Sequence, residues 1–246
     1  MCGKGKGIVM SGHSKWKNIM HKKEKTDAQR ASVFTKIGKE ISIAVREGGP
    51  DPVSNTRLRD LIQKAKANNV PNDNIERVIK KAAGGDGAQY EVVVYEGYGI
   101  GGVAVIVETT TDNRNRTAAD IRHSFDKCGG NMGTTGCVSF MFADKGVIVV
   151  DGKTVADEDR FMEDVMDFTG DDGIFEVFTD PSELPSVRDA LAEKGYAFLS
   201  AEVEKIPNTY VRLEDEEQRT KMNKLLGMLE DNDDVQNVWH NWEDDE

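Results

Sequence analysis

The chain has 246 residues, of which 38% are hydrophobic and 31% charged, an ordinary composition for a globular protein of two or three domains. No apolar run approaches the roughly 18 residues that a membrane-spanning helix needs, and the first residues lack the apolar core of a signal peptide, so we expect a cytoplasmic protein with no membrane partner. The net charge of −12, taken as a whole, argues against a nucleic-acid partner.

The basic residues, however, are concentrated at the start of the chain. Residues 1–84 contain 18 Lys and Arg against 8 Asp and Glu, whereas residues 85–246 contain 14 against 36. Because charges in cellular salt are screened over about 8 Å, a polyanion that touches the first segment senses mainly its local positive charge. This segregation indicates contact with nucleic acid.

Residues 1–25 are predicted to form a basic flexible arm. The stretch 13–25 contains five lysines and one acidic residue, with little apolar periodicity. Its lysines can neutralise phosphates, and Trp16 offers a ring on which an unpaired base could stack. The alternative is that Trp16 anchors the arm on the helices that follow. The candidate nucleic-acid contacts of the arm are His13, Lys15, Trp16, Lys17, His21, Lys22, Lys23 and Lys25.

A helical domain is expected over residues 26–85. Apolar residues recur at helical spacing in three segments, each of which ends at Gly or before Pro. The segments run from Thr26 to Gly48, from about Leu58 to before Pro71, and from near Asp73 to Gly84. We expect this domain to extend the basic surface of the arm. The candidate contacts that it adds are Arg30, Lys36, Lys39, Arg57, Arg59, Lys64 and Lys66.

From residue 88 the apolar period changes to that of mixed strands and helices. Strands are predicted at Tyr90–Glu96, Val103–Thr109, Ile174–Phe178, Phe198–Val203 and Val235–His240. A hairpin is predicted from Val138–Phe142 and Val147–Val150, with its turn at Asp144-Lys145-Gly146. Helices are predicted at Arg116–Lys127, Asp157–Phe168, Ser182–Lys194 and Glu214–Leu229. This order favours open sheets with helices on one face, the α+β class.

Two motifs in this region have competing interpretations. Gly97-Tyr98-Gly99-Ile100-Gly101-Gly102 satisfies GxGxxG, but a dinucleotide site needs a helix next, and here a strand follows, so we interpret it as a hairpin turn. Arg114 and Arg116 precede a predicted helix, where arginine and the helix N-terminus suit phosphate. Helix capping combined with interdomain salt bridges explains the same residues equally well.

Catalysis, a metal and a cofactor are not expected. Cys128 and His123, five residues apart on one predicted helix, do not face each other well and have no identifiable acid partner. The Cys and His spacings do not resemble a zinc site, and the acidic run Glu230–Asp234 lacks the ligand spacing of an EF-hand.

Several ordered motifs together resemble the YebC/PmpR family. They are Ser11-Gly12-His13-Ser14-Lys15-Trp16, Lys36 to Glu40 with Gly48-Gly49-Pro50-Asp51-Pro52, Pro71-Asn72-Asp73-Asn74-Ile75-Glu76-Arg77, Tyr95-Glu96-Gly97-Tyr98-Gly99, Asp112-Asn113-Arg114-Asn115-Arg116-Thr117, Lys127-Cys128-Gly129-Gly130-Asn131 and Asp231 to Gln236. The resemblance covers about residues 10–240. Members of the family include the mitochondrial translational activator of cytochrome oxidase subunit one.

The resemblance implies three domains, an all-α module at 26–85 followed by two α+β domains. The second domain comprises 86–135 and 207–246, and the third, 136–206, is inserted into it. It also implies a regulator of gene expression, either a DNA-binding transcriptional regulator or a ribosome-associated translation factor that contacts ribosomal RNA. The alternative is a protein-interaction adaptor that uses its acidic α+β domains, with the arm incidental. The oligomeric state stays open.

Overall fold

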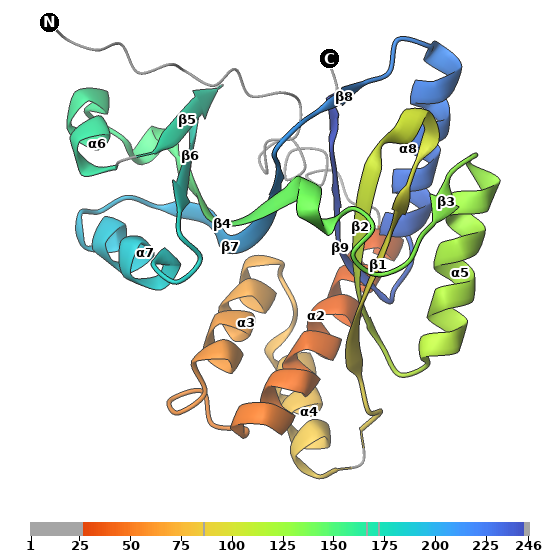
Figure 1. Ribbon diagram of the computed structural model, residues 1–246. Helices are drawn as coiled ribbons and strands as arrows, with labels where there is room; N and C mark the ends of the chain where they lie inside the picture. Colours follow the sequence, from red (N-terminus) through yellow and green to blue (C-terminus); the bar gives the residue numbers. More distant parts are fainter. Residues whose placement is uncertain (1–26, 86, 166, 172, 244–246) are drawn as a thin grey trace, which may run out of the picture. The chain divides into compact units, whose positions relative to one another are not determined.

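The computed structural model describes residues 27–85, 87–165, 167–171 and 173–243 (Figure 1). These residues form two compact units. The main unit comprises residues 27–139 and 214–240, and the inserted unit comprises residues 140–213 and 241–243. The inserted unit thus interrupts the sequence of the main unit, which begins with a helical domain and continues as an α+β domain. The predicted α+β class, with an all-α module first, is confirmed.

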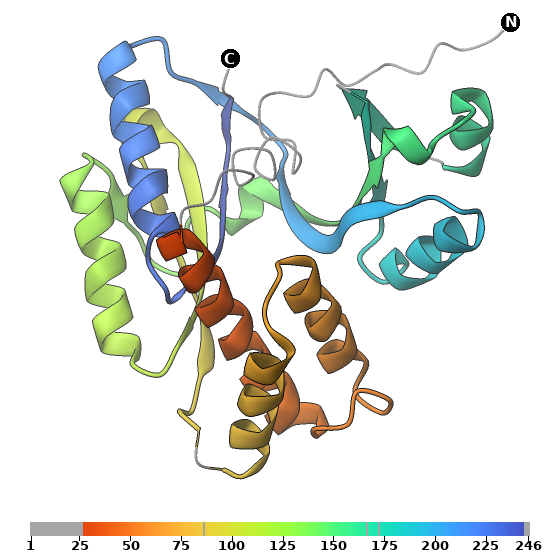
Figure 2. The same ribbon diagram turned by 180° about the vertical axis from the view of Figure 1, so that it is seen from behind.

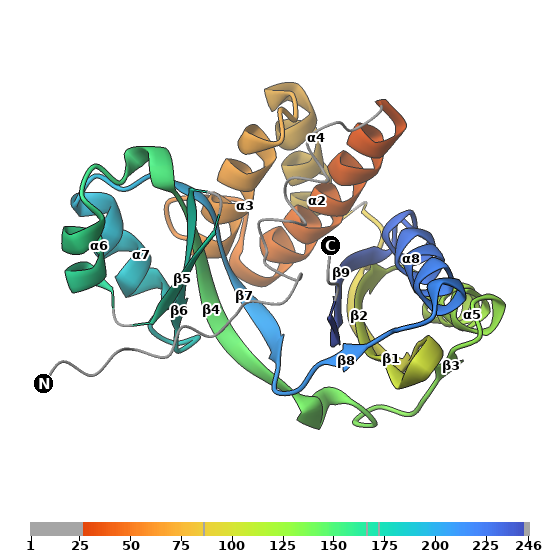
Figure 3. The same ribbon diagram turned by 90° about the horizontal axis from the view of Figure 1, so that it is seen from above.

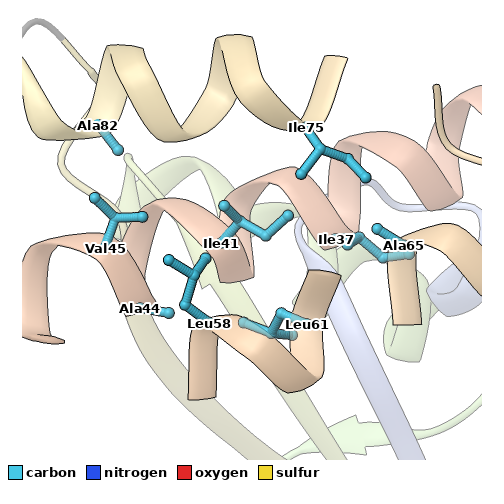
Figure 4. Packing of buried hydrophobic residues seen from close by; sticks show 9 residues of the cluster. All are labelled: Ile37, Ile41, Ala44, Val45, Leu58, Leu61, Ala65, Ile75 and Ala82. Carbon is cyan, nitrogen blue, oxygen red and sulfur yellow. The ribbon is translucent and has the colours of Figure 1, made fainter. Parts of the chain in front are cut away.

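The helical domain consists of α2 (Asp27–Gly48), α3 (Thr56–Ala67) and α4 (Asn72–Ala83). Figure 4 shows α2 between the other two helices, with its apolar stripe, including Ile37 and Ile41, packed against Leu58 of α3 and Ile75 of α4. Burying such side chains stabilises the domain by about 1.5–3 kcal/mol each. The three predicted helices are confirmed, and the domain has a hydrophobic core of its own.

The α+β domain of the main unit is built on an antiparallel sheet in the order β3-β1-β2-β9. Its strands are β1 (Glu91–Tyr98), β2 (Ala104–Thr111), β3 (Asn131–Met132) and β9 (Val235–His240). Two helices, α5 (Arg114–Lys127) and α8 (Glu216–Glu230), lie side by side on one face (Figures 2 and 3). The glycine-rich motif forms η1 (Ile100–Gly102) between β1 and β2, as predicted for a hairpin turn.

The inserted unit contains a second antiparallel sheet, in the order β5-β6-β4-β7. Its strands are β4 (Phe142–Asp151), β5 (Phe168–Asp171), β6 (Ile174–Thr179) and β7 (Phe198–Pro207). The remaining elements are η2 (Ser139–Met141), η3 (Gly152–Thr154), α6 (Glu158–Asp164), α7 (Leu184–Glu193) and the two-stranded parallel pair of β8 (Val211–Arg212) and β10 (Trp242–Glu243). Ile148 and Val150 of β4 pack with Phe161 of α6 and Leu191 of α7, so both helices cover the same face.

The hairpin predicted around Asp144-Lys145-Gly146 is wrong. Phe142–Asp151 is one continuous strand, in which Asp144 lies opposite Lys205 of β7 at an Nζ–Oδ1 distance of 2.7 Å. These residues have turn propensity, but cross-strand partners about sixty residues away hold the backbone extended. The helix predicted at Asp157–Phe168 also ends earlier, at Asp164, because Phe168 begins the edge strand β5 and packs its ring against Phe161.

Candidate nucleic-acid interface

The predicted contacts of the arm lie outside the described residues. They are His13, Lys15, Trp16, Lys17, His21, Lys22, Lys23 and Lys25. Residues 1–26 contain seven Lys and one Glu, which is six of the net ten positive charges of residues 1–84. The helical domain therefore supplies the smaller share of the positive charge, and the surroundings of its cations decide how much of that share faces solvent.

Most of the cations predicted on α3, and one near the start of α2, are exposed. The exposed residues are Arg30, Arg57, Arg59 and Lys66. Arg57 forms an ion pair with Glu47 at 2.5 Å, and the partly buried Lys64 lies 3.3 Å from Glu40. Exposed pairs of this kind contribute only about 0–1 kcal/mol, so they do not prevent either cation from exchanging its carboxylate for a phosphate.

Helix α4 exposes three further cations that were not among the predicted contacts. Arg77, Lys80 and Lys81 are all solvent-exposed, and Arg77 donates to Oδ1 of Asn74 at 2.7 Å. Their spacing of three and four residues places them on neighbouring positions of the helix surface. That spacing, opposite the apolar positions of α4, is the signal in the sequence by which they could have been found.

Lys36 and Lys39 of α2, in contrast, contact the α+β domain of the main unit. The Nζ of Lys36 donates to the backbone oxygen of Glu230 at 2.6 Å, at the C-terminal end of α8, where unpaired carbonyls attract a cation. Lys39 is only 8% exposed; it donates to the backbone oxygen of Asp233 at 2.9 Å and forms an ion pair with Asp234. In this conformation the two lysines join α2 to the α8–β9 loop.

Asp234 is the centre of this polar network. Its carboxylate, 6% exposed as a residue, accepts hydrogen bonds from Lys39, from Thr117 Oγ1 at 2.7 Å and from Arg116 at 2.9 Å. Burial alone would raise the pKa of Asp234, but these three donors outweigh burial and lower it from 3.8 to about 2. One ionised carboxylate thus connects α2, α5 and the α8–β9 loop.

In the loop before α5, polar residues cap the helix and pair with one of the two arginines. Asn113 caps the helix by accepting the backbone N–H of Arg116 at 3.1 Å. The Arg116 guanidinium bridges Asp112 and Asp234, each at 2.9 Å, and hydrogen bonds to these carboxylates raise its pKa further. Arg114, two residues earlier, is exposed. The geometry gives Arg116 a bridging role, although its side chain is half-exposed, and Arg114 is exposed as well.

A polar cavity of about 340 Å³ lies beside this network. It is lined by Thr35, Lys39, Tyr90, Asp112, Arg116, Asp120, Asn232, Asp233 and Asp234. Four aspartates against two cations give a lining that does not favour phosphate. Among the described residues, no group of three or more His, Cys, Asp and Glu is placed to hold a metal ion.

The pair considered for catalysis occupies two different environments. His123 is exposed on α5, whereas Cys128 is buried beyond its end, with Sγ 4.0 Å from Sδ of Met228. Cys128 therefore packs as a small apolar residue beside a methionine of α8.

Comparison with known proteins assigns the chain to a family over nearly its whole length. Residues 14–85 match the TACO1/YebC protein N-terminal domain, and residues 90–242 match the TACO1/YebC second and third domain. The chain belongs to the TACO1/YebC family. The resemblance identified from the sequence motifs is confirmed, and the two matched segments meet between α4 and β1.

Relatives within the TACO1/YebC family share about half of their residues with this chain. A protein of Acetivibrio thermocellus is 58% identical over 239 residues, covering 95% of this chain and 99% of its own, and one of Caldicellulosiruptor bescii is 55% identical, covering 96% and 100%. Both are named probable transcriptional regulatory protein. The crystal structure of a conserved hypothetical protein from Aquifex aeolicus has a TM-score of 0.84 at 46% identity, covering 94% of this chain and 97% of that one.

The names of the relatives support a regulatory role for this member of the TACO1/YebC family. Within the part of the chain that the structure describes, no helix combines the length and apolar character needed to cross a membrane.

Proposed function

We propose that this TACO1/YebC protein is a non-enzymatic regulator of gene expression that binds nucleic acid through its arm and helical domain. The observation that carries the proposal is the segregation of charge: residues 1–84 have a net charge of +10, and residues 85–246 have a net charge of −22. Neutralising phosphates releases counterions and is the main source of affinity in weakly specific complexes. The acidic remainder keeps other parts of the protein away from the polyanion.

The residue types favour phosphate contact over base reading. The exposed cations of α3 and α4 are mixed Lys and Arg, but the arm contributes only Lys to its set of cations. Lysine positions a backbone as a point charge, whereas base-edge reading in a groove relies on Arg, Asn or Gln in fixed geometry. We therefore propose a weakly sequence-specific contact, as with ribosomal RNA on the ribosome, in preference to reading of promoter DNA.

Charge reversal on α4 and in the arm tests the proposal. Lys80→Glu with Lys81→Glu, and separately Lys22→Glu with Lys23→Glu, should weaken binding to a single-stranded RNA and reduce the log–log salt slope by about 1.4 for two lost contacts. The matched control is Lys153→Glu with Lys224→Glu, exposed lysines outside the helical domain that make the same change in net charge. If both test variants bind the RNA at low salt as tightly as the unsubstituted protein does, the proposed nucleic-acid binding is contradicted.

Crosslinking in cells from Lys17 or Trp16, followed by sequencing of the attached nucleic acid, separates the two targets. Recovery of ribosomal RNA supports the proposal, and recovery of promoter DNA without ribosomal RNA contradicts the translation role.

The acidic inserted unit favours a second candidate, the protein-interaction adaptor. Residues 140–213 contain 17 acidic and 7 basic residues, a surface suited to a basic partner. Deletion of residues 1–25 distinguishes the two candidates, because an adaptor keeps its activity without the arm and a nucleic-acid binder loses most of it.

A further inference from the structure

Within the main unit, the helical domain meets the α+β domain through polar groups of α2. Ser32, Lys36 and Lys39 lie one turn apart along that helix, and all three bond to the end of α8 or to the loop after it. Ser32 Oγ donates to Oδ1 of Asp233 at 2.7 Å, and Lys39 pairs with Asp234. The apolar core of the helical domain, by contrast, is built from residues of α2, the short segment after α3, α3 and α4 alone. At the end of α8 and in the loop after it, the two domains are therefore joined by polar and charged groups of α2.

The covalent connection between the two domains suits a change in their relative orientation. Only residues 84–90 separate α4 from β1, and this segment includes Gly84, Gly85 and Gly87. Gly85 has a φ of 76°, and a side-chain carbon added there would meet no atom within 4 Å. Glycine lets a short connection change its backbone angles at little steric cost.

We propose that Asp233 and Asp234 form an electrostatic latch that holds α2 against the α+β domain, and that a phosphate polymer favours the open state in which Lys36 and Lys39 turn to the polymer. This inference rests on the proposed function. In the closed state both lysines are satisfied by the protein itself and contribute nothing to phosphate binding. In the open state the helix directly after the arm gains two cations, and two aspartates move away from the polyanion.

The coupling has to act in both directions. If nucleic acid binds the open state more tightly, it shifts the protein toward that state, and any change that opens the latch must raise the affinity for nucleic acid. Two additional phosphate contacts on a single strand make the log–log salt slope steeper by about 1.4. Tighter binding together with this steeper slope is therefore the signature of an opened latch.

Asp234→Asn tests the latch, with Asp120→Asn as the matched control. Both substitutions remove one negative charge from the lining of the same cavity, but Asp120 is exposed on α5 and does not contact α2 in the polar network described above. Spin labels at Val53→Cys, which is 83% exposed in the helical domain, and at Lys224→Cys on α8 report the distance between the two domains in a Cys2→Ser, Cys137→Ser background.

We expect Asp234→Asn to lengthen or broaden this distance without nucleic acid, and poly(U) RNA to produce the same change in the unsubstituted protein. Asp234→Asn should also bind poly(U) more tightly than Asp120→Asn does. If Asp234→Asn does not fold, Lys36→Met removes the contact with Glu230 at the rim of the interface and should give the same change in distance.

If the distance between the two spin labels is unchanged in these variants, the latch is overturned, whatever their affinity for RNA. A latch that opens in Asp234→Asn but does not respond to bound RNA overturns the coupling. A protein that shows the opening and never binds RNA at low salt instead contradicts the proposed function.

Discussion

Asp234→Asn has a second consequence, in the dependence of stability on pH. The pKa of Asp234 falls from 3.8 to about 2 on folding, because hydrogen bonds from Lys39, Thr117 and Arg116 outweigh the effect of burial. At about 1.36 kcal/mol per unit, the ionised carboxylate contributes roughly 2–3 kcal/mol to the free energy of unfolding at pH 7. Because the folded pKa lies below the unfolded one, this stabilisation is complete above pH 3.8 and is lost as the pH falls through about 2.

Asparagine resembles the protonated carboxyl group in shape and in lack of charge. The variant should therefore be roughly 2–3 kcal/mol less stable than the unsubstituted protein at pH 7, and the difference should shrink to about half of that at pH 3. Urea unfolding at a series of pH values, followed by circular dichroism, measures both quantities. Asp120→Asn, an exposed control, should stay within about 0.5 kcal/mol at every pH. A difference for Asp234→Asn that does not vary with pH would refute the assignment of the low pKa to this network.

Two further side chains have roles that stability measurements can check. Glu96→Gln should lower the free energy of unfolding by about 2–3 kcal/mol, because the Glu96 carboxylate accepts hydrogen bonds from three backbone N–H groups of residues 136–139. Hydrogen exchange of that loop should become faster, and unchanged exchange would contradict this role of Glu96. Asn55→Ala should lower the free energy of unfolding, measured with urea, by about 2 kcal/mol, since the buried Asn55 amide caps α3 and donates to the backbone oxygens of Ala44 and Gly49. A loss below about 0.5 kcal/mol would show that the cap is dispensable.

The helical domain was predictable because its determinants are local. Apolar residues at helical spacing on α2, from Ile37 to Val45, are the same residues that form the core. Glycine ends α2 and caps α4 as predicted, whereas α3 ends at Ala67, before the predicted stop at Pro71. The prediction for β4 was wrong because the determinants of this strand are not local. Asp144-Lys145-Gly146 has the composition of a turn, and the strand that keeps it extended is supplied by residues near 205.

The environment of the α2 lysines could not be predicted from local pattern. Ser32, Lys36 and Lys39 share one face of α2 at a spacing of four and three residues, which is as typical of a solvated face as of an interface. The partners of Lys39, Asp233 and Asp234, lie 194 and 195 residues later. A lysine that contacts phosphate and a lysine that pairs with a buried carboxylate look alike in sequence, and only the fold distinguishes them.

The net charge of a segment is therefore not the charge that it presents to a partner. The helical residues 27–85 contribute four of the net ten positive charges of residues 1–84, and in the closed state Lys36 and Lys39 are bound by the protein's own oxygens. In the closed state, the cations that the helical domain presents to a polyanion are then Arg30 near the start of α2 and the exposed residues of α3 and α4, together with those of the arm. Opening the latch would restore the two lysines of α2, so the strength of nucleic-acid binding would depend on domain orientation as well as on the number of cations.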